Sequence, residues 1–271
     1  MSLIDKTVGE KIFDAFNCFL MAAFMITILY PFWNLFVVSI NSQAGSNASF
    51  LIWPQGITPA NYKHVLSNPY IWIGYRETVI RTVCGTFFSV LFTSIGAYVL
   101  SKRNFPNRTF WTMMVVIPMF FQGGLIPSYI WNVTLGLKDS RLALILPGLI
   151  SSYNLIIVRN FFMTIPKELE ESARIDGANS LRVFFRIIIP VSKAALATIT
   201  LWILVGHWNA WFDATIYINS ASKFPLQVVL RRILLEGTQQ LMDINPQMGD
   251  NNVKTSPDTL KAAAVFGVMI P

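Results

Sequence analysis

Charged residues are scarce in this sequence: Lys, Arg, Asp and Glu make up 13% of its 271 residues, whereas a soluble domain has about 25%. Hydrophobic residues make up 54%. The few charges leave long uncharged gaps, at residues 15–62, 82–101, 109–137, 142–158 and 194–212. A helix needs about 20 apolar residues to cross a bilayer, and backbone in lipid has to satisfy its own hydrogen bonds. The sequence therefore predicts an all-α integral membrane protein.

Cysteine and histidine are also rare, and they are limited to Cys18, Cys84, His64 and His207. Both cysteines lie in apolar stretches, where a small buried side chain is usual, so we predict neither a disulfide nor a metal site. A membrane enzyme needs clustered acids, bases or metal ligands, and two distant histidines do not supply them. We therefore predict no catalytic residue.

The sequence lacks the G-x-x-x-x-G-K-[ST] phosphate loop. Any ATP that drives this protein must then bind to another polypeptide, and the chain itself is predicted to bind no cofactor.

The formal net charge is +7. Lys102, Arg103 and Arg108 cluster in a short loop between two apolar stretches, as is typical of a cytoplasmic membrane surface. Nucleic-acid binding has no other support. With the termini in the cytoplasm, eleven of the 21 Lys and Arg residues would lie inside and ten outside, which leaves the orientation nearly undecided. Arg76 and Arg81 lie at the end of one apolar stretch, where charges count most.

Apolar stretches predict membrane spans at residues 12–40, 78–100, 110–131, 141–162 and 191–218. The first is expected to be interrupted at Pro31. It is too long for a secretory signal and lacks a cleavage site after a short core, so we expect it to be retained. The third contains Pro118, Gly123, Gly124 and Pro127, which should make it bend or line a cavity.

A sixth apolar stretch starts near Asp258 and has only the uncharged residues 262–271 before the sequence stops. That is about half of a crossing. We therefore expect the last helix to be truncated and the functional protein to continue beyond Pro271.

Residues 164–190, between the fourth and fifth spans, have the features of two short helices joined by a hinge. Pro166 suits a first helical turn, and acids complement the positive end of the helix dipole at Glu168, Glu170 and Glu171. Gly177 can end this helix with a positive φ. Ser180 is expected to cap a second helix over residues 181–189, which Pro190 ends.

The first of these helices has small side chains on one face. By the three-and-four spacing, that face carries Leu169, Ser172, Ala173 and Asp176. Small residues there permit close approach by a partner protein.

The spacing within this segment is specific. Three residues separate Gly177 from the preceding Glu171-Ser172-Ala173. Nine residues separate it from the following Ile187-Ile188-Ile189-Pro190. This resembles the EAA loop of ATP-binding-cassette importer permeases, which reads Glu-Ala-Ala, x3, Gly, x9, Ile-x-Leu-Pro. Ser172 and Ile189 depart from that pattern, both with side chains of similar size.

Further pairs look like the carbohydrate-uptake branch of that family, above all the smaller, maltose-importer-like permeases. They are Asp176-Gly177-Ala178, Tyr153-Asn154, Phe161-Phe162, Trp53-Pro54, Asn61-Tyr62, Pro118 through Pro127, and Trp208-Asn209. Together they span nearly the whole chain.

The resemblance implies a six-transmembrane-helix type I importer permease, a single domain over residues 1–271. It implies a cytoplasmic coupling loop at residues 164–190 and extracytoplasmic segments at residues 41–75 and 219–257. The loop would dock onto a soluble ATPase and move with it. The residues assigned to that coupling are Glu170, Glu171, Ser172, Ala173, Arg174, Asp176, Gly177, Ala178 and Pro190.

The same resemblance implies partners and a location. These are a second homologous permease, two ATP-binding-cassette ATPase subunits that bind ATP and Mg, and an extracytoplasmic solute-binding protein that delivers an oligo- or polysaccharide. The location would be the bacterial cytoplasmic membrane.

A possible substrate path is formed by Trp208, Asn209, Trp211, Asp213 and Gln122, whose stacking faces and hydrogen-bonding ends suit sugars. Aromatic residues near an interface also serve as anchors, and the partner permease can line the cavity instead. The alternative function is an ion-gradient-driven secondary sugar carrier, which needs intramembrane carboxylates or histidines. His207 and Asp213 are the candidates inside the spans, and counting along the helix puts Asp213 at the far membrane surface, where it can simply be wet.

Overall fold

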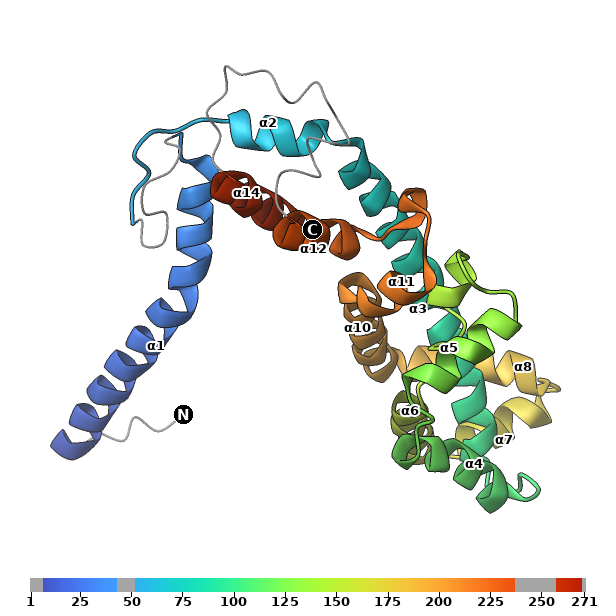
Figure 1. Ribbon diagram of the computed structural model, residues 1–271. Coiled ribbons are helices and arrows are strands. Elements are labelled where there is room, and N and C mark those ends of the chain that lie inside the picture. The colour runs from blue at the N-terminus through green and yellow to red at the C-terminus, as the bar shows by residue number, and fades with distance from the viewer. Residues whose placement is uncertain (1–6, 43–51, 237–256, 270–271) are drawn as a thin grey trace. The chain divides into compact units, whose positions relative to one another are not determined.

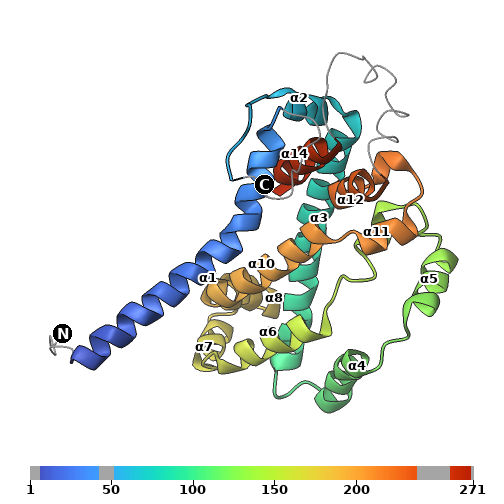
Figure 2. The same cartoon turned by 60° about the vertical axis from the view of Figure 1, so that its left-hand side comes forward.

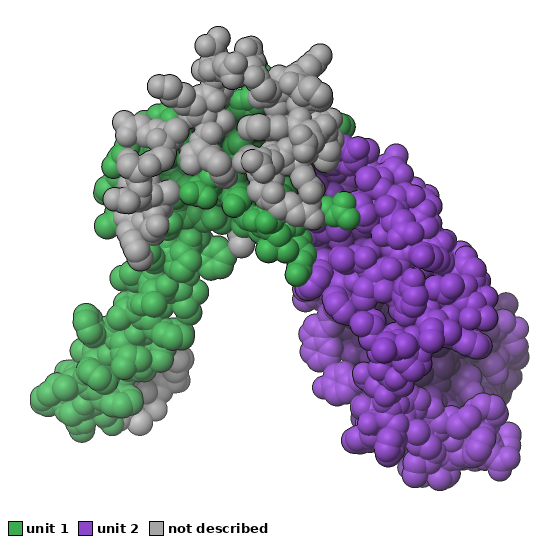
Figure 3. Space-filling model, in the orientation of Figure 1, with its two compact units in different colours: residues 1–69, 230–271 green, residues 70–229 purple. Residues whose placement is uncertain are grey.

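The structure is a computed structural model that describes residues 7–42, 52–236 and 257–269. These residues form helices and contain no strand, apart from an isolated antiparallel bridge between Asn41 and Ile57. The prediction of an all-α protein is confirmed. The chain divides into two compact units, Met1–Pro69 with Leu230–Pro271, and Tyr70–Val229 (Figure 3).

The first unit contains α1 (Val8–Ile40), α2 (Ala60–Ser67) and α14 (Pro257–Met269). Thr7 and Glu10 form a capping box at the start of α1, with Thr7 N donating to Glu10 Oε2 over 2.8 Å. The C-terminal end of α1 packs against α14. The ring centroids of Phe36 in α1 and Phe266 in α14 are 5.2 Å apart. Asn61 of α2 donates to the carbonyls of Ser39 and Asn41.

Helix α1 runs through Pro31 without a break, so the predicted interruption there is wrong. A proline inside a helix costs about 3 kcal/mol. Unwinding backbone in lipid costs several kcal/mol for each unsatisfied group, which is more. The apolar side chains along α1, such as Phe13, Phe19 and Phe24, are exposed, as in a helix that faces lipid.

The second unit is built around α3 (Pro69–Ser101). Its other helices are α4 (Arg108–Phe120), α5 (Leu125–Thr134), α6 (Ser152–Thr164), α7 (Glu168–Ile175), α8 (Ser180–Val183), α9 (Ile189–Val191), α10 (Lys193–Asn209) and α11 (Phe212–Tyr217), with α12 (Leu226–Glu236) beginning in it. Short turns stand at η2 (Arg141–Leu144), η3 (Phe184–Ile188) and η4 (Ala221–Lys223). Figures 1 and 2 both show α6 and α10 beside α3.

Two described helices, α1 and α3, are long and apolar enough to cross a membrane alone, and two bent pairs raise this to as many as four spans. Helices α4 and α5 meet at 118° across residues 121–124. This confirms the bend predicted in the third span. The other pair joins Ser180–Val191 to α10 at 84°.

The fourth and fifth spans differ from the prediction. In the fourth span only α6 is an α-helix. The chain before it forms the short 3-10 helix η2 and then a loop. Pro147 lies in this loop and disfavours helical backbone in the residue that precedes it. The fifth span breaks at Ala210, so that α10 and the short α11 are separate helices. Residues 43–51 and 237–256 of the predicted extracytoplasmic segments, and residues 270–271 of the last helix, lie outside the described residues.

Candidate functional site

Helix α7 begins and ends where the sequence of residues 164–190 leads us to expect. Its first turn carries Glu168, Glu170 and Glu171, where acids stabilise the positive end of the helix dipole. Gly177 has φ +79°, and its N–H donates to Arg174 O. The N–H of Ala178 donates to Ala173 O over 2.9 Å. This pair of bonds is a Schellman motif, which requires the left-handed backbone that glycine adopts at little cost.

The second helix of the segment starts differently from the prediction. Asn179, not Ser180, is the cap, because its Oδ1 accepts from Arg182 N over 2.9 Å. The helix then continues through a π-helical turn, η3, and past Pro190 to Val191. Pro190 does not end it, because the π-helical turn directly before Pro190 shifts the backbone hydrogen bonds and can accommodate the missing N–H.

The second helix holds the segment to the core of its unit. Val183, Phe184 and Ile188 are buried with α3, α6 and α10 residues, and Ala173 and Ala178 pack against the same cluster. Lys102 at the end of α3 forms an ion pair with Glu170, and its Nζ lies 3.8 Å from the centre of the Tyr98 ring. The Glu170 carboxylate is therefore already paired with a cation of the same chain.

The remaining residues predicted for coupling lie on the outward surface of α7, directly after it, or, for Pro190, in α9. Glu171, Ser172, Arg174 and Asp176 are exposed, and so are Gly177 and Pro190. Sequence reasoning missed Ile175, which is 87% exposed, and Leu181, which is 68% exposed. Apolar side chains left exposed in a polar segment are the signal that points to them.

The residues predicted for a substrate path occupy three places. Trp208 is half-buried and Asn209 exposed at the end of α10, while Gln122 is exposed in the break between α4 and α5. Trp211 precedes α11, and its ring stands edge-on to Phe212 at 5.6 Å between centroids. Asp213 is not simply wet, because it is half-buried and bound to Arg81.

Arg81 crosslinks α3 to the break between α10 and α11. Its side chain is 5% exposed. Nη1 donates to Asp213 Oδ1 over 3.2 Å and to Ala210 O over 3.3 Å, and Nη2 also binds the carboxylate. The pair neutralises a buried charge and joins residues 132 positions apart in the sequence.

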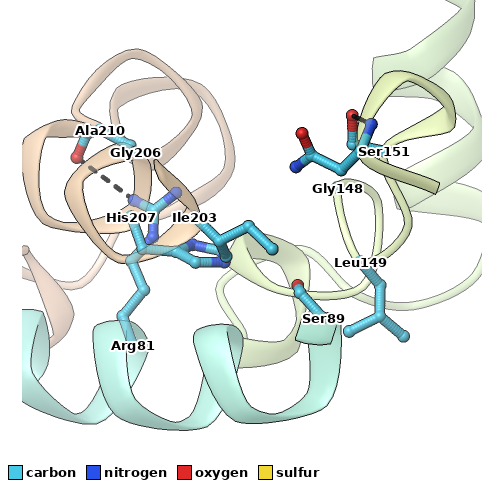
Figure 4. Close-up of a pocket in the computed structure, with 10 residues that line it drawn as sticks. Arg81, Ser89, Gly148, Leu149, Ser151, Ile203, Gly206, His207 and Ala210 are labelled. Atoms are coloured by element: carbon cyan, nitrogen blue, oxygen red, sulfur yellow. Dashed lines mark hydrogen bonds between the residues drawn. The ribbon is translucent and has the colours of Figure 1, made fainter. Parts of the chain in front are cut away.

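A pocket of about 250 Å³ lies next to this ion pair (Figure 4). Its walls come from α3, from the chain leading into α6, and from α10. They are Arg81, Ser89, Gly148, Leu149, Ser151, Asn154, Ile203, Gly206, His207 and Ala210. None of the residues predicted for the substrate path lines it. The sequence signal that was available is a lone arginine inside an apolar stretch.

A second polar cluster ties two loops together outside the long helices. Asp139 accepts from Ser220 Oγ at 2.5 Å, from Ser220 N at 3.0 Å and from Asn219 N at 3.1 Å, and it also binds Lys223. The bond from the Ser220 hydroxyl, followed by the other bonds from Ser220 and Lys223, holds the pKa of Asp139 well below its usual range.

In the part of the chain that the structure describes, no group of three or more His, Cys, Asp or Glu residues could hold a metal ion.

Comparisons with known proteins match nearly the whole chain. Residues 6–220 match the family described as "Binding-protein-dependent transport system inner membrane component". "Protein LplC" of Bacillus subtilis (strain 168) is 39% identical over 270 residues, which are 98% of this chain and 90% of that protein. The "Polygalacturonan/rhamnogalacturonan transport system permease protein YtcP" of the same organism is 36% identical, over 97% of this chain and 91% of that protein.

A solved structure is similar over the same extent. It is a "crystal structure of a bacterial ABC transporter involved in the import of the acidic polysaccharide alginate". One chain of it matches with a TM-score of 0.90 and 30% sequence identity, covering 99% of this chain and 95% of that chain.

Proposed function

The chain belongs to the binding-protein-dependent transport system inner membrane components, and from this membership we propose that it is one permease of a heterodimer that imports an oligo- or polysaccharide. It is a membrane-spanning subunit of an ATP-binding-cassette importer, and it carries no ATPase site of its own. Membership of this family excludes the ion-gradient-driven carrier.

The proposed substrate class is supported by the similarity to the alginate importer. The TM-score of 0.90 at 30% identity covers 99% of the chain. The 36% identical relative is described as a polygalacturonan and rhamnogalacturonan transport permease. Both names specify a polysaccharide, which supports an oligo- or polysaccharide as the substrate here.

Transport would then follow from an assembly in the bacterial cytoplasmic membrane. Residues 1–271 would act as one permease domain beside a second homologous permease. Two ATPase subunits would bind ATP and Mg, and an extracytoplasmic solute-binding protein would deliver the sugar. The absence of a phosphate loop from this sequence supports placing ATP on the partners.

Segment 164–190 would transmit the movement of the ATPase pair. Its outward surface, made of Glu171, Ser172, Arg174, Asp176 and Gly177, is exposed and available to a partner. The second helix ties this surface to α3, α6 and α10 through its buried residues Val183, Phe184 and Ile188. A push on α7 would therefore reach the membrane helices through packed side chains. We also assign Trp208, Asn209, Trp211, Asp213 and Gln122 to the substrate path, since their side chains suit sugars.

Uptake by the reconstituted complex tests this function. The four membrane and ATPase subunits are placed in proteoliposomes with ATP inside and the binding protein outside. Labelled galacturonate, alginate and malto-oligosaccharides are then offered. We expect accumulation of at least one of them that depends on both ATP and the binding protein. Failure of the complex to accumulate any of these saccharides in a way that depends on ATP and the binding protein would overturn the proposed substrate class.

A further inference from the structure

The second helix of segment 164–190 meets the span that follows it almost at a right angle. This helix, residues 180–191, is bent by 84° from α10. Residues 194–209 of α10 contain no Lys, Arg, Asp or Glu and suit the hydrocarbon. Arg182 and Arg186 do not, because a charged side chain is costly there. With α10 across the membrane, residues 180–191 therefore lie along the membrane surface, and we call them the surface helix.

The surface helix and the start of α10 carry positive charge only. Arg182, Arg186 and Lys193 are exposed, and residues 177–212 contain no acid. In the described part of the chain, none of these three cations forms an ion pair. By contrast, residues 167–176, which form α7 and its two caps, contain four acids and two cations. The surface helix therefore suits an anionic surface, whereas α7 does not.

Apolar side chains are exposed among these cations. Leu181 and Phe185 point outward beside Arg182 and Arg186, while the opposite side of the helix is buried in the core of its unit. Basic and apolar side chains together on the outward side of a helix are typical of the membrane interface. The apolar groups enter the acyl region there, and the cations stay at the level of the phosphates.

An apolar groove of about 550 Å³ starts where the surface helix meets α10 and runs between α10 and α3. Among the described residues that line it, only Lys193 is charged. Three others carry hydroxyls, and the apolar ones are Phe87, Val90, Leu91, Ile189, Leu196 and Ala197. Thr200, also in the wall, lies about 10 Å further along α10 than Lys193 at 1.5 Å per residue. The groove therefore reaches from the headgroup level into the hydrocarbon, whose half-thickness is about 15 Å.

We propose that this corner binds an anionic phospholipid, whose acyl chain occupies the groove and whose headgroup lies at Lys193, beside the cations of the surface helix. The site is separate from the sugar path and from the ATPase contact. It rests on the proposed topology, in which segment 164–190 lies on the cytoplasmic side, because the cytoplasmic leaflet is the one rich in anionic lipid. An apolar helix of a second protein would fill the groove but would leave the cations without a counter-charge.

Photolabelling of the purified complex tests the site without any substitution. The probe is phosphatidylglycerol with a diazirine in one acyl chain, present at low concentration in phosphatidylcholine nanodiscs that hold the complex. Labelled peptides are identified by mass spectrometry. We expect label on the groove residues of α3 and α10. Added unlabelled phosphatidylglycerol should remove it, and the same amount of added phosphatidylcholine should not.

Charge variants test the headgroup contact. Arg186→Gln combined with Lys193→Gln should lower groove labelling by about fivefold or more, since each cation near an anionic surface contributes about fivefold to binding. Arg103→Gln combined with Lys167→Gln is the matched control. It removes the same number of exposed cations outside the surface helix and should leave the labelling unchanged.

Filling the groove tests the acyl-chain contact. Ala197→Phe places a ring in the groove and should abolish the labelling. Ala194→Phe is the matched control, because Ala194 is exposed on the same helix but does not line the groove. Subunit content is measured in every sample to show that the complex is intact.

Absence of label from the groove of the wild type would overturn the site and would mean that another chain covers it. Equal competition by phosphatidylcholine would also overturn it, as would labelling that is unchanged in the double charge variant or in Ala197→Phe. Sugar uptake by the same complex is measured separately, so the proposed function stands or fails independently of lipid binding.

Discussion

Arg81 and Asp213 show how much depends on a single pair of side chains inside the second unit. The Arg81 side chain is 5% exposed and the Asp213 side chain 31% exposed, so the two charges are desolvated to different extents. Removing one partner of a buried pair costs about 3–5 kcal/mol, because the other charge is left unpaired. The cost should be larger when the more deeply buried charge is the one that remains.

We therefore expect Asp213→Leu to lower the thermal unfolding temperature of the purified subunit complex more than Arg81→Leu does. The double variant should be more stable than the sum of the two losses implies, since it leaves no unpaired charge. The measurement is thermal unfolding in detergent for the complete double-mutant cycle. Additive losses, or a greater loss from Arg81→Leu, would contradict the role assigned to this pair.

Asp139 gives a pH dependence with a definite sign. Its pKa is lowered in the folded protein by bonds from Ser220 and Lys223, while in the unfolded chain it is about 3.9. The stabilising contribution is therefore fully present above the unfolded pKa. It is lost as the pH falls through the folded pKa, because the unfolded state binds the proton first.

Asp139→Asn removes that titration and keeps a residue that tolerates the φ of +56° found there. We expect the wild type to unfold at a higher temperature than the variant at pH 6, and the difference to shrink as the pH falls below about 4. Thermal unfolding measured from pH 6 to pH 3 gives this comparison. A difference that grows at low pH would show that the carboxylate is not stabilised as described.

At the scale of elements, the contact of α10 with α3 depends on a missing side chain. A Cβ on Gly85 would stand 2.7 Å from Nε2 of His207, which is closer than packed atoms approach. Gly85→Ala should therefore force α10 away from α3 and cost about 1–3 kcal/mol through overpacking. Gly96→Ala should cost less, because its Cβ would meet the flexible end of Leu155 at 3.1 Å.

The check is thermal unfolding of both variants, with Gly85→Ala also made in a His207→Ala background. We expect the second substitution to relieve most of the loss, since it removes the ring that Cβ would strike. If Gly85→Ala is equally harmful without His207, the close contact is not what requires glycine there.

Gly177, in the hinge between α7 and α8, has to adopt a positive φ. Its effect on coupling can be tested separately from its effect on stability. Valine at Gly177 would adopt φ +79° at a cost of about 1–2 kcal/mol. Asparagine tolerates that conformation. We expect Gly177→Val to reduce sugar uptake and ATPase association, and Gly177→Asn to retain both.

Gly136→Val is the matched control, because Gly136 has φ +69° and also has nothing within 4 Å of a built Cβ. It should impose similar backbone strain and leave ATPase association unchanged. The amount of ATPase subunit that co-purifies with each variant decides the matter. Equal losses at both glycines would mean that only stability had been affected.

For the whole molecule, the features that could be predicted from sequence are those determined by neighbouring residues. The apolar stretches predict helices in lipid, and the Schellman motif at Gly177 follows from local helix-ending chemistry. The bend in the third span follows from its prolines and glycines. The spacing from Glu171 to Pro190 identified the family, and the comparisons confirm it.

The rest depends on partners that are distant in sequence. Asp213 meets Arg81 across 132 positions, and Glu170 meets Lys102 across 68. Local signals also compete: Asn179 and Ser180 are both good caps, and the choice depends on where the second helix packs. The pocket beside Arg81 was missed for the same reason, because its walls come from three separate segments.

We propose that an ATPase partner acts on the membrane helices through the exposed surface of α7. Glu171→Lys tests it by reversing one charge on that surface. Losing an acid at a helix start costs only about 0.3–1 kcal/mol, so the fold should tolerate the change. Asp258→Lys reverses an exposed acid in the first turn of α14 and serves as the matched control.

The decisive measurement is ATP hydrolysis by the purified complex, with and without the sugar-loaded binding protein. We predict that Glu171→Lys abolishes the stimulation by the binding protein and weakens ATPase association, while Asp258→Lys keeps both. Full stimulated hydrolysis and uptake in the Glu171→Lys complex would contradict the account and leave residues 164–190 as a connector between helices.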